Sequence, residues 1–434
     1  MSEARPGSLR RVVITGLGVV APNGIGTEAF WQASVAGRSG IRHITRFDAS
    51  SLPTRIAGEV KDFDAEQLGL TQEEALYLDR SAQFSIAAAN LALQDAGLSV
   101  PLDEEKRNRI GVYMGSAMPI VEECEKLWER LLEPSVQPDD LFSDGSVPIN
   151  LALTHASAVS IASHHQLHGP CTVISTGCSA GTDAIGEAYW AIQDGRADCI
   201  LAGGSDASLS NLSLGVFSNM GALSTRNEEP ERASRPYDHK RDGFVIAEGA
   251  GVILLEEREL AIARGAHIYA ELIAFTTNSN AHHMTALPPD GDPLRQLLTQ
   301  SLCKACISAK QLGYINSHGS STLLNESAET AAYKGAFGEQ AYRIPISSTK
   351  SMIGHSQGAA SAIETIVTAL VLKHQCIPPT INLEFADPLC DLDYVPNNAR
   401  SANVNVALTH SSGFGGVNSV LILAHPEWIG SYAD

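Results

Sequence analysis

Short runs of Val and Ile alternate along the chain with longer segments in which apolar residues recur at helical spacing. The β-branched runs cover residues 12–15, 110–114, 172–175, 200–203, 252–256, 313–316, 344–347 and 419–424. The helical patterns cover residues 79–96, 179–193, 293–309 and 359–374. This alternation predicts an α/β fold with a largely parallel, buried sheet. No linker interrupts the pattern, so we expect one compact unit with two halves of similar texture, 1–262 and 263–434.

Two polar stretches stand out from this alternation. Apolar residues at 120, 121, 124, 127, 128, 131 and 132 predict a helix over 120–133, whose other face is acidic and which a polar stretch follows to residue 146. We expect a surface helix with a solvated acidic face, and a lid or subunit contact is the alternative. The polar span 224–241 predicts a surface excursion between a helix and a strand.

Composition and charge narrow the function. The 434 residues are 44% apolar and 18% charged, which provides a large core and excludes general disorder. With 30 basic and 49 acidic residues, the net charge of −19 disfavours binding of nucleic acid. The apolar run 12–21 is far shorter than the ~20 residues of a membrane span and lacks a signal cleavage pattern. We therefore expect a cytoplasmic protein without a membrane segment.

Glycines and cysteines give two weaker signals. Gly16 and Gly18 resemble a dinucleotide-binding fingerprint, but residues 22–24 (Pro-Asn-Gly) predict a turn in place of the helix that such a site requires. The eight cysteines are too scattered for a disulfide scaffold. The pair Cys303 and Cys306 has no second pair at zinc-ligand spacing, so we expect no metal site and interpret most cysteines as small buried hydrophobes.

The position of Cys178 favours a chemical role for its thiol. Residues 172–175 predict a strand, Cys178 follows it, and the small residues 179–181 open a helix. The free N–H groups and the positive dipole end of a helix N-terminus stabilise a thiolate, and they could also hold an oxyanion. This placement alone favours a nucleophile and a buried structural thiol about equally.

Two histidine loops favour the nucleophile. His318 lies where a predicted strand runs into a Gly/Ser/Thr loop, and His355 repeats that pattern with Lys350 five residues earlier. Glycines on both sides of Phe414 predict a further tight loop that can aim a backbone N–H inward. Together with Cys178, these loops predict one converging catalytic site.

With these motifs, the chain resembles the β-ketoacyl-acyl-carrier-protein synthases of the thiolase fold. The motifs that carry the resemblance span nearly the whole chain: residues 11–18, the segment around Cys178, residues 233–238 and 241–244, the two histidine loops, and residues 387–396 and 413–416. The resemblance implies a five-layer αβαβα fold of two similar halves, the first with the nucleophile and the second with the His/Lys loops.

The resemblance also implies a role for each residue of the site. Cys178 corresponds to the nucleophile that accepts the acyl chain. His318 and His355 correspond to the pair that supports decarboxylation of a malonyl thioester and stabilises the enolate. Lys350 corresponds to a residue that orders the charge network with Glu329.

The remaining positions concern binding. The backbone N–H of Phe414, in the loop with Gly413 and Gly415, resembles half of the family's oxyanion hole, the other half being the N–H of the nucleophile. The Phe414 ring resembles the gate of the pocket. Ser320 and Thr322 stand where hydroxyls contact a phosphopantetheine arm. No bound cofactor is implied, because the substrates arrive on the arm of an acyl carrier protein.

Local features separate the subtypes of this family. Gly177 before the nucleophile and residues 78–83 and 283–291 resemble the ketosynthase-α subunit of type II polyketide synthases, which implies a heterodimer with a chain-length-factor homologue. Residues 348–351 and 413–418 look closer to a fatty-acid β-ketoacyl-ACP synthase II, which implies a homodimer. We favour the polyketide subunit and keep the fatty-acid enzyme as the alternative.

Three other classes of protein fit the residues less well. A non-catalytic chain-length factor would lack the nucleophile, which Cys178 supplies. A degradative thiolase would carry a second cysteine where this chain has Phe414. A cysteine-dependent thioester hydrolase would leave the second histidine loop unexplained.

Overall fold

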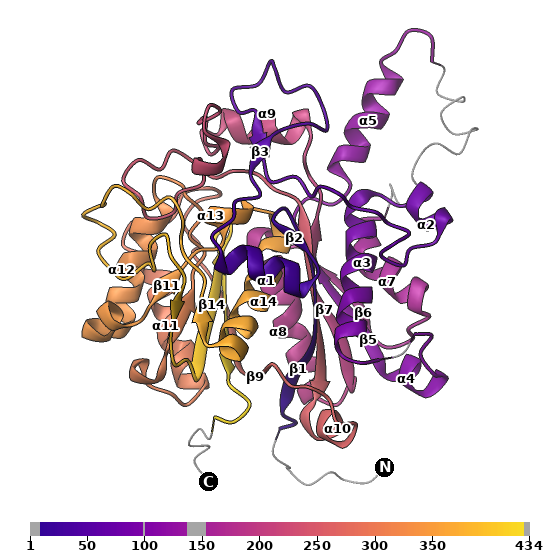
Figure 1. Ribbon diagram of the computed structural model, residues 1–434, viewed down its shortest axis with the longest axis vertical. Coiled ribbons are helices and arrows are strands. Elements are labelled where there is room, and N and C mark those ends of the chain that lie inside the picture. Colours follow the sequence, from indigo (N-terminus) through magenta and orange to yellow (C-terminus); the bar gives the residue numbers. More distant parts are fainter. Residues whose placement is uncertain (1–8, 99, 137–152, 429–434) are drawn as a thin grey trace.

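The computed structural model describes residues 9–98, 100–136 and 153–428, so part of the polar stretch predicted up to residue 146 lies outside the described residues. Its centre is one sheet of eleven strands (Figure 1). Across the sheet the order is β11 (Ile346–Ser347), β10 (Tyr314–Asn316), β14 (Val406–Ser412), β15 (Val417–Ala424), β9 (Ala270–Ser279), β1 (Val12–Ala21), β8 (Gly249–Glu257), β7 (Cys199–Asp206), β5 (Ile110–Gly115) and β6 (Cys171–Ile174), with β2 (Gly24–Ile25) paired to β1.

The sheet is mixed, so the prediction of a largely parallel sheet is wrong. Strand β5 pairs in parallel with β6 and β7, and β10 with β11 and β14, but the central strands β15, β9, β1, β8 and β7 are joined by antiparallel ladders. Helices cover both faces of the sheet, so central strands such as β1 and β8 are buried, mainly apolar runs over their whole length. Such a run carries no information on strand direction.

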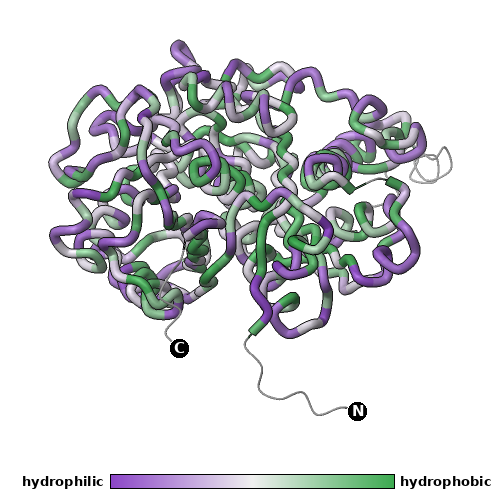
Figure 2. Tube along the Cα trace, turned by 60° about the horizontal axis from the view of Figure 1, so that its bottom comes forward, coloured by the Kyte–Doolittle hydropathy of each residue, from purple (hydrophilic) through white to green (hydrophobic). Residues whose placement is uncertain are grey.

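The two halves of the sheet lie on opposite sides of a central pair of helices, and further helices cover their outer faces. This arrangement gives five layers, as predicted (Figure 1). Helices α3 (Arg80–Asp95) and α7 (Ala156–His165) cover the outer face of one half, and α11 (Asp292–Lys304) and α12 (Asn325–Phe337) that of the other. Between the halves lie α8 (Ala180–Gln193) and α14 (Gly358–His374). Fifteen consecutive residues of α14 are buried, which is typical of a helix enclosed on all sides. Figure 2 shows apolar positions concentrated along these inner segments.

Shorter helices and strands complete the structure outside these layers. They are α1 (Thr27–Val35), α2 (Gln72–Tyr77), α4 (Glu104–Arg109), α5 (Val121–Leu131), α9 (Asn211–Asn219), α10 (Arg258–Ala263), α13 (Lys350–Ile353), the small ladders of β3 (Arg42–His43) with β4 (Ile56–Ala57) and β12 (Cys376–Ile377) with β13 (Arg400–Ser401), and 3₁₀ turns at Gly177–Ser179, Pro230–Arg232, Ala309–Gln311 and Gly338–Arg343. Strands from before and after residue 262 occupy opposite sides of the sheet, while the division into two domains stays a prediction. In the described part of the chain, no helix combines the length and apolarity that crossing a membrane requires.

Gly16 and Gly18 lie inside β1, not in a turn, and the turn follows at Pro22 and Asn23. A Cβ at Gly18 would lie 1.9 Å from the carbonyl oxygen of Ala88 in α3, and one at Gly16 would lie 2.2 Å from that of Ala92. The two glycines therefore allow α3 to pack directly on the strand.

The predicted surface excursion over 224–241 holds for its first part, where residues 228, 229, 231 and 232 are exposed, but residues 233–238 are buried. Arg235 is only 1% exposed and Asp238 is fully enclosed. In this buried part, Arg235 pairs with Asp238 of the same span at 3.1 Å and with Glu384 of a distant loop at 2.9 Å, so its charge is neutralised.

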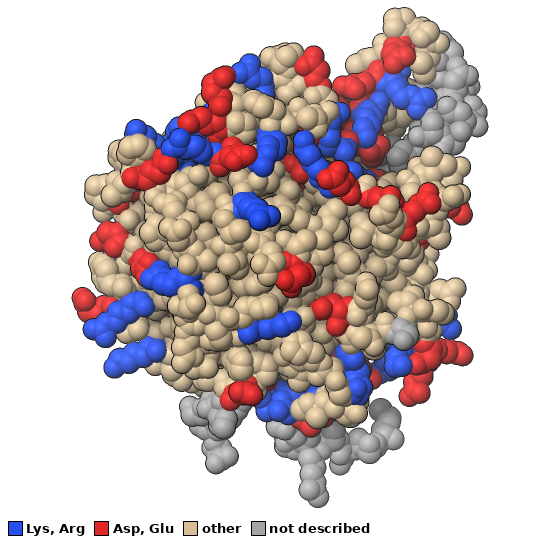
Figure 3. Space-filling view, in the orientation of Figure 1, with Lys and Arg blue, Asp and Glu red and all other residues tan. Residues whose placement is uncertain are grey.

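Helix α5 is present as predicted, but only part of its acidic face is solvated. Glu122 is buried and forms ion pairs with Arg46 and, at 2.8 Å, with Lys126. In Figure 3, acidic and basic side chains accordingly lie side by side along this projecting helix. Trp128 and Leu132 are 65% and 68% exposed. The expected solvated acidic face holds for Glu129 and Glu133, which are exposed, but not for Glu122, and apolar side chains also lie at the surface.

The cysteines are less buried than predicted. Only Cys178 and Cys390 are buried, while Cys303 and Cys306 are both exposed. Cys303 falls in the last turn of α11, which ends at Lys304 rather than near residue 309.

The close packing of β1 on α3 gives a stability test. Gly18→Ala should lower the free energy of unfolding by about 1–3 kcal/mol, because the new methyl group overlaps a backbone carbonyl. The matched control is Gly215→Ala in α9, where the new Cβ meets no heavy atom within 4 Å. The control should leave stability unchanged or raise it by up to about 1 kcal/mol. Urea denaturation measures both, and equal effects would contradict the packing argument.

Candidate active site

Cys178 lies in a 3₁₀ turn between β6 and α8, close to the predicted place at a helix N-terminus. Its side chain is 6% exposed and lines a cavity. Asp183 stabilises this turn. Its carboxylate accepts hydrogen bonds from the hydroxyls of Thr176, Ser179 and Ser419. These bonds tie the nucleophile turn to α8 and to β15.

The thiol of Cys178 is not held as a thiolate. Burial raises its pKa to about 11, although the charge of Lys350 and the backbone N–H groups of Phe414 and of Cys178 itself act in the opposite direction. The expected stabilisation of a thiolate is thus present, but desolvation outweighs it. The proton of Cys178 has to leave in the step in which the sulfur attacks.

His355 is fixed between α13 and α14 as a neutral donor. The backbone N–H of Gln357 donates to its Nδ1 at 3.1 Å. Nδ1 is therefore the unprotonated nitrogen, and the proton of the neutral ring lies on Nε2. Burial and the nearby charge of Lys350 lower the pKa of His355 well below 6.5, so the ring stays neutral at pH 7.

His318 follows β10 and lies beside His355, with the ring centres 5.4 Å apart and the planes at 79°. Burial, the charge of Lys350 and the neighbouring His355 lower the pKa of His318 well below its ordinary value. The two histidine loops therefore bring two neutral imidazoles to one cavity, as the sequence predicted.

Lys350 links the two histidine loops. Its ammonium group donates to the backbone carbonyl of His318 at 2.8 Å and forms an ion pair with Glu364 of α14. Both partners of the pair are at most 1% exposed. Glu364 was missed by the sequence reasoning, although a single carboxylate in an otherwise apolar helix was a usable signal.

Glu329 does not pair with Lys350, so the predicted network needs correction. The Glu329 carboxylate accepts from the Tyr237 hydroxyl at 2.8 Å and from the backbone N–H of Gly319 at 3.1 Å, and it lies 3.0 Å from His410. These contacts hold the loop after His318, while α14 brings Glu364 to the ammonium group instead.

The cavity has a volume of about 390 Å³ and is lined by Cys178, both histidines, Ser320 and Thr322. The hydroxyls of Ser320 and Thr322 lie 3.0 Å apart. The Arg241 guanidinium donates to the Thr322 carbonyl at 2.8 Å and to Asp387 at 2.5 Å, which fixes the loop that carries these hydroxyls.

The glycine loop reaches the nucleophile from the other side. A Cβ at Gly413 would lie 3.0 Å from the backbone nitrogen of Cys178, so glycine permits this close approach. The Phe414 ring is 38% exposed and stacks with Phe217 at 6.4 Å. Gly415 turns away from the cavity and donates its N–H to the carbonyl of Met284 at 2.7 Å.

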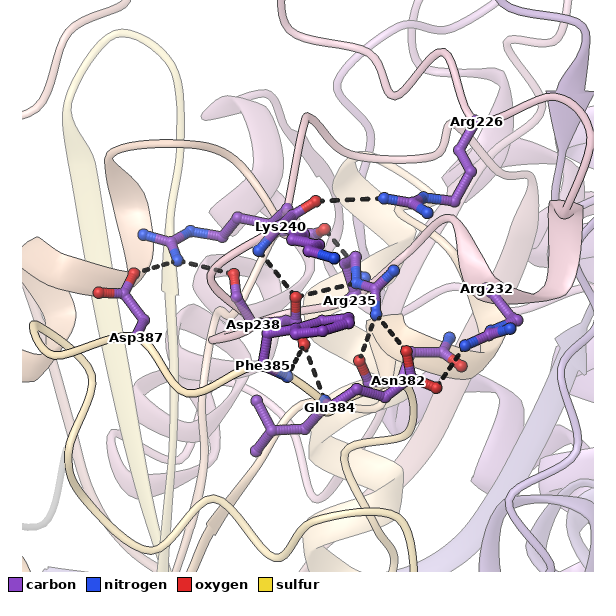
Figure 4. Close-up of polar contacts among 12 residues, drawn as sticks. Arg226, Arg232, Arg235, Asp238, Lys240, Asn382, Glu384, Phe385 and Asp387 are labelled. Carbon is purple, nitrogen blue, oxygen red and sulfur yellow. Dashed lines mark hydrogen bonds and ion pairs between the residues drawn. The ribbon is translucent and has the colours of Figure 1, made fainter.

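The buried residues 233–238 contact the loops that carry the site. The Ser234 hydroxyl donates to the Lys350 carbonyl at 2.7 Å, and the backbone N–H of Arg235 donates to the Ser321 hydroxyl at 2.9 Å. Figure 4 shows Arg235 between Asp238 and Glu384. This support was not predicted, because a polar sequence gives no sign that distant partners will bury it.

Comparisons with known proteins identify the family. The model of the beta-ketoacyl synthase N-terminal domain matches residues 9–261, and that of the C-terminal domain matches residues 269–384. The chain belongs to the β-ketoacyl synthases and is an enzyme of the acyltransferase type, which confirms the predicted family.

Two relatives carry names that correspond to the two subtypes considered for this chain. The tetracenomycin polyketide synthase ketoacyl synthase alpha subunit of Streptomyces glaucescens is 44% identical over 426 residues, covering 96% of this chain and 98% of the relative. The 3-oxoacyl-[acyl-carrier-protein] synthase 2 of Coxiella burnetii is 43% identical over 415 residues, with 96% and 98% covered.

Solved structures agree with the fold. A type II polyketide synthase ketosynthase, solved in complex with its acyl-carrier protein and bound to a hexaketide, superposes with a TM-score of 0.86 at 39% identity, covering 97% of this chain and all of the other. The ishigamide ketosynthase/chain length factor gives 0.86 at 33% identity, with 96% and 99% covered. The predicted thiolase-like fold is confirmed.

The pairing of Lys350 gives the first test of the site. Glu364→Gln leaves a buried ammonium group without its counter-charge and should lower the free energy of unfolding by about 3–5 kcal/mol. In a double-mutant cycle with Lys350→Met, Glu364→Gln should couple more strongly than Glu329→Gln does. Stronger coupling to Glu329 would restore the network predicted from the sequence.

The neutral imidazoles predict an unusual pH dependence. Because the pKa values of His318 and His355 lie well below 6.5 in the folded protein, both rings keep their donor form as the pH falls from 8 to 6. Malonyl decarboxylation by folded enzyme should therefore stay constant over this range. The unfolded chain binds more protons below pH 6.5, so these two residues make folding less stable there. A rate that halves near pH 6.5 while circular dichroism stays unchanged would contradict the assignment.

Proposed function

We propose that this β-ketoacyl synthase is the condensing ketosynthase of a type II polyketide synthase. It joins an acyl or polyketide chain held on Cys178 to malonyl-acyl-carrier protein and releases CO₂. The observation that carries the proposal is the convergence of Cys178, His318 and His355 on one cavity, with the backbone N–H of Phe414 directed at the thiol.

The first half-reaction loads the chain. The Cys178 sulfur attacks the thioester carbonyl, and the thiol proton passes to a neutral imidazole of the same cavity and from there to the leaving sulfur, so the carrier protein departs as its free thiol. The oxyanion of the tetrahedral intermediate is held by the N–H groups of Cys178 and Phe414. One such donor is worth roughly 2.7–4 kcal/mol.

The second half-reaction forms the carbon–carbon bond. Loss of CO₂ from malonyl thioester leaves an enolate, whose oxygen accepts hydrogen bonds from the His318 and His355 rings. The enolate carbon attacks the acyl carbonyl on Cys178, and collapse of the intermediate gives β-ketoacyl-carrier protein and the free cysteine. Neutral rings suit this role, because a donor that stays uncharged does not have to be deprotonated before the next cycle.

The fatty-acid enzyme remains the second candidate. The relatives of the two branches are 44% and 43% identical to this chain, so identity alone does not separate them. Gly177 favours the polyketide subunit, and its φ of 69° is a conformation that glycine adopts without strain.

We propose an acyl carrier protein and a chain-length-factor homologue as partners, with a homodimer as the alternative. Strand β6 ends the sheet, and the side chains of Cys171 and Thr172 on it are exposed. An open sheet edge is a surface on which a second chain can pair. The exposed Trp128 and Leu132 of α5 are candidates for the same contact.

The roles of the cavity residues can be separated by mutation. Cys178→Ala should abolish acyl transfer and leave malonyl decarboxylation possible, because the enolate donors remain. His318→Ala or His355→Ala should instead suppress decarboxylation by roughly 100-fold or more, the loss typical of one such donor. Mass spectrometry should find the acyl group on Cys178 and on no other cysteine. Full condensation by Cys178→Ala would refute the nucleophile.

Assembly gives a separate test. Expressed alone, the chain should aggregate or be weakly active, and co-expression with a chain-length-factor homologue should give a 1:1 complex. Thr172→Lys on the sheet edge should weaken that complex, whereas Leu389→Lys, at a site 65% exposed in the other half, should not. A stable homodimer that elongates saturated chains at full rate would favour the fatty-acid enzyme.

A further inference from the structure

One residue of the loop after His318 is fixed at each of its polar groups. Ser321 is fully buried, and its backbone N–H donates to the Glu326 carboxylate of α12. Its carbonyl accepts from the backbone N–H of Gly243 at 3.0 Å. Its hydroxyl accepts from the backbone N–H of Arg235 at 2.9 Å. Contacts with two distant segments therefore set the conformation of Ser321, which takes no part in the mechanism above.

The backbone of Ser321 is strained. Its φ of 71° is a left-handed value that residues other than glycine rarely adopt. Such strain persists where the surrounding structure imposes it, and it is concentrated at functional sites. The three hydrogen bonds impose it here, and the one to Arg235 is the only one of the three that depends on the side chain of Ser321.

The strained residue lies between two hydroxyls of the cavity. Ser320 and Thr322 both line the cavity, and their hydroxyl oxygens are 3.0 Å apart. On the far side of this pair, the Arg241 guanidinium donates to the carbonyls of Thr322 at 2.8 Å and Leu323 at 3.2 Å. With the loop fixed at both ends, the conformation of Ser321 determines how the two hydroxyls lie relative to each other.

We propose that Ser321 is a positioning residue that holds the hydroxyls of Ser320 and Thr322 as one binding pair for the phosphopantetheine arm of the substrate. The inference rests on the proposed function, in which substrates arrive on this arm, and deepens it with a residue that does not itself touch the arm. The arm carries amide groups, and a hydroxyl can donate to or accept from an amide. Two hydroxyls held in place bind the arm without first having to be ordered.

This role predicts an unusual order of two variants. Ser321→Ala keeps a Cβ at the left-handed φ but removes the bond to Arg235, so the loop can relax and the hydroxyl pair separates. Ser321→Gly removes the same bond, but glycine adopts this φ without strain. The hydroxyls should therefore stay closer to their places in Ser321→Gly, although it removes more atoms. A residue that served only for packing would give the opposite order.

The experiment compares the decarboxylation of malonyl-pantetheine with that of malonyl S-methyl thioester, which lacks the arm. The readout is the ratio of the two kcat/KM values on one enzyme, so that a general loss of active protein cancels. Ser321→Ala should lower this ratio about tenfold, the loss expected from two weakened neutral hydrogen bonds, and Ser321→Gly only about threefold. The change should lie in the KM for malonyl-pantetheine, while its kcat stays the same.

Two controls separate positioning from a general effect on the fold. Asp62 also has a left-handed φ, of 56°, but it is exposed and lies outside the cavity, so Asp62→Gly should leave the ratio unchanged. In protein that carries both Ser320→Ala and Thr322→Val, the two hydroxyls are absent. Ser321→Ala should then lower the ratio no further, because it acts through them.

Three results overturn the inference: an unchanged ratio in Ser321→Ala, a larger loss in Ser321→Gly than in Ser321→Ala, or a further loss where both hydroxyls are absent. If Ser321→Ala fails to fold, Ser321→Gly decides the question, and a ratio equal to that of the wild type overturns the inference. The proposed function fails in a different way, namely if the wild type decarboxylates neither malonyl thioester.

Discussion

The ammonium group of Lys350 is enclosed between α13, the loop of His318 and α14, and three features of the site follow from its position. It holds the His318 carbonyl, it pairs with Glu364, and its charge lowers the pKa of both histidines. A buried charge is tolerated only when it is paired and hydrogen-bonded. The ion pair therefore fixes the relative position of the two histidine loops, and the charge of Lys350 adds to burial, the larger cause, in lowering the pKa of both rings.

Around this pair, the fold supplies donors rather than a strong base. The backbone N–H of Gln357 fixes the proton of His355 on Nε2, and the close approach of the Gly413 loop brings the Phe414 N–H to the thiol. Decarboxylation generates the carbanion equivalent without a strong base, so stabilisation of negative charge on oxygen is what the protein has to provide. The neutral rings and backbone donors match that requirement.

Much of the site could be predicted because its signals are local. Cys178 lies between a β-branched run and small helical residues, His318 follows a strand, and each histidine has a glycine beside it. The partner of Lys350 could not be predicted in this way, because the choice between Glu329 and Glu364 depends on how α12 and α14 pack.

The errors of the fold prediction also arise because contacts between distant segments cannot be predicted from local sequence. The α/β class followed from the alternation of strands and helices and the five layers from the family resemblance, but strand direction did not follow, because a strand covered on both faces is apolar in either direction. The span 224–241 reads as surface because Arg235 and Asp238 are charged. Its residues 233–238 are nevertheless buried, and Glu384, almost 150 residues away in the chain, completes the charge pairs there.

The most direct test of the account is a titration of His318 and His355 by nitrogen-15 NMR in the wild type and in Glu364→Gln. In the wild type, we predict that both rings remain neutral from pH 8 to below 6, with the His355 proton on Nε2. Two rings that titrate near pH 6.5, or a His355 protonated on Nδ1, would contradict the claim that a buried lysine holds a pair of neutral donors.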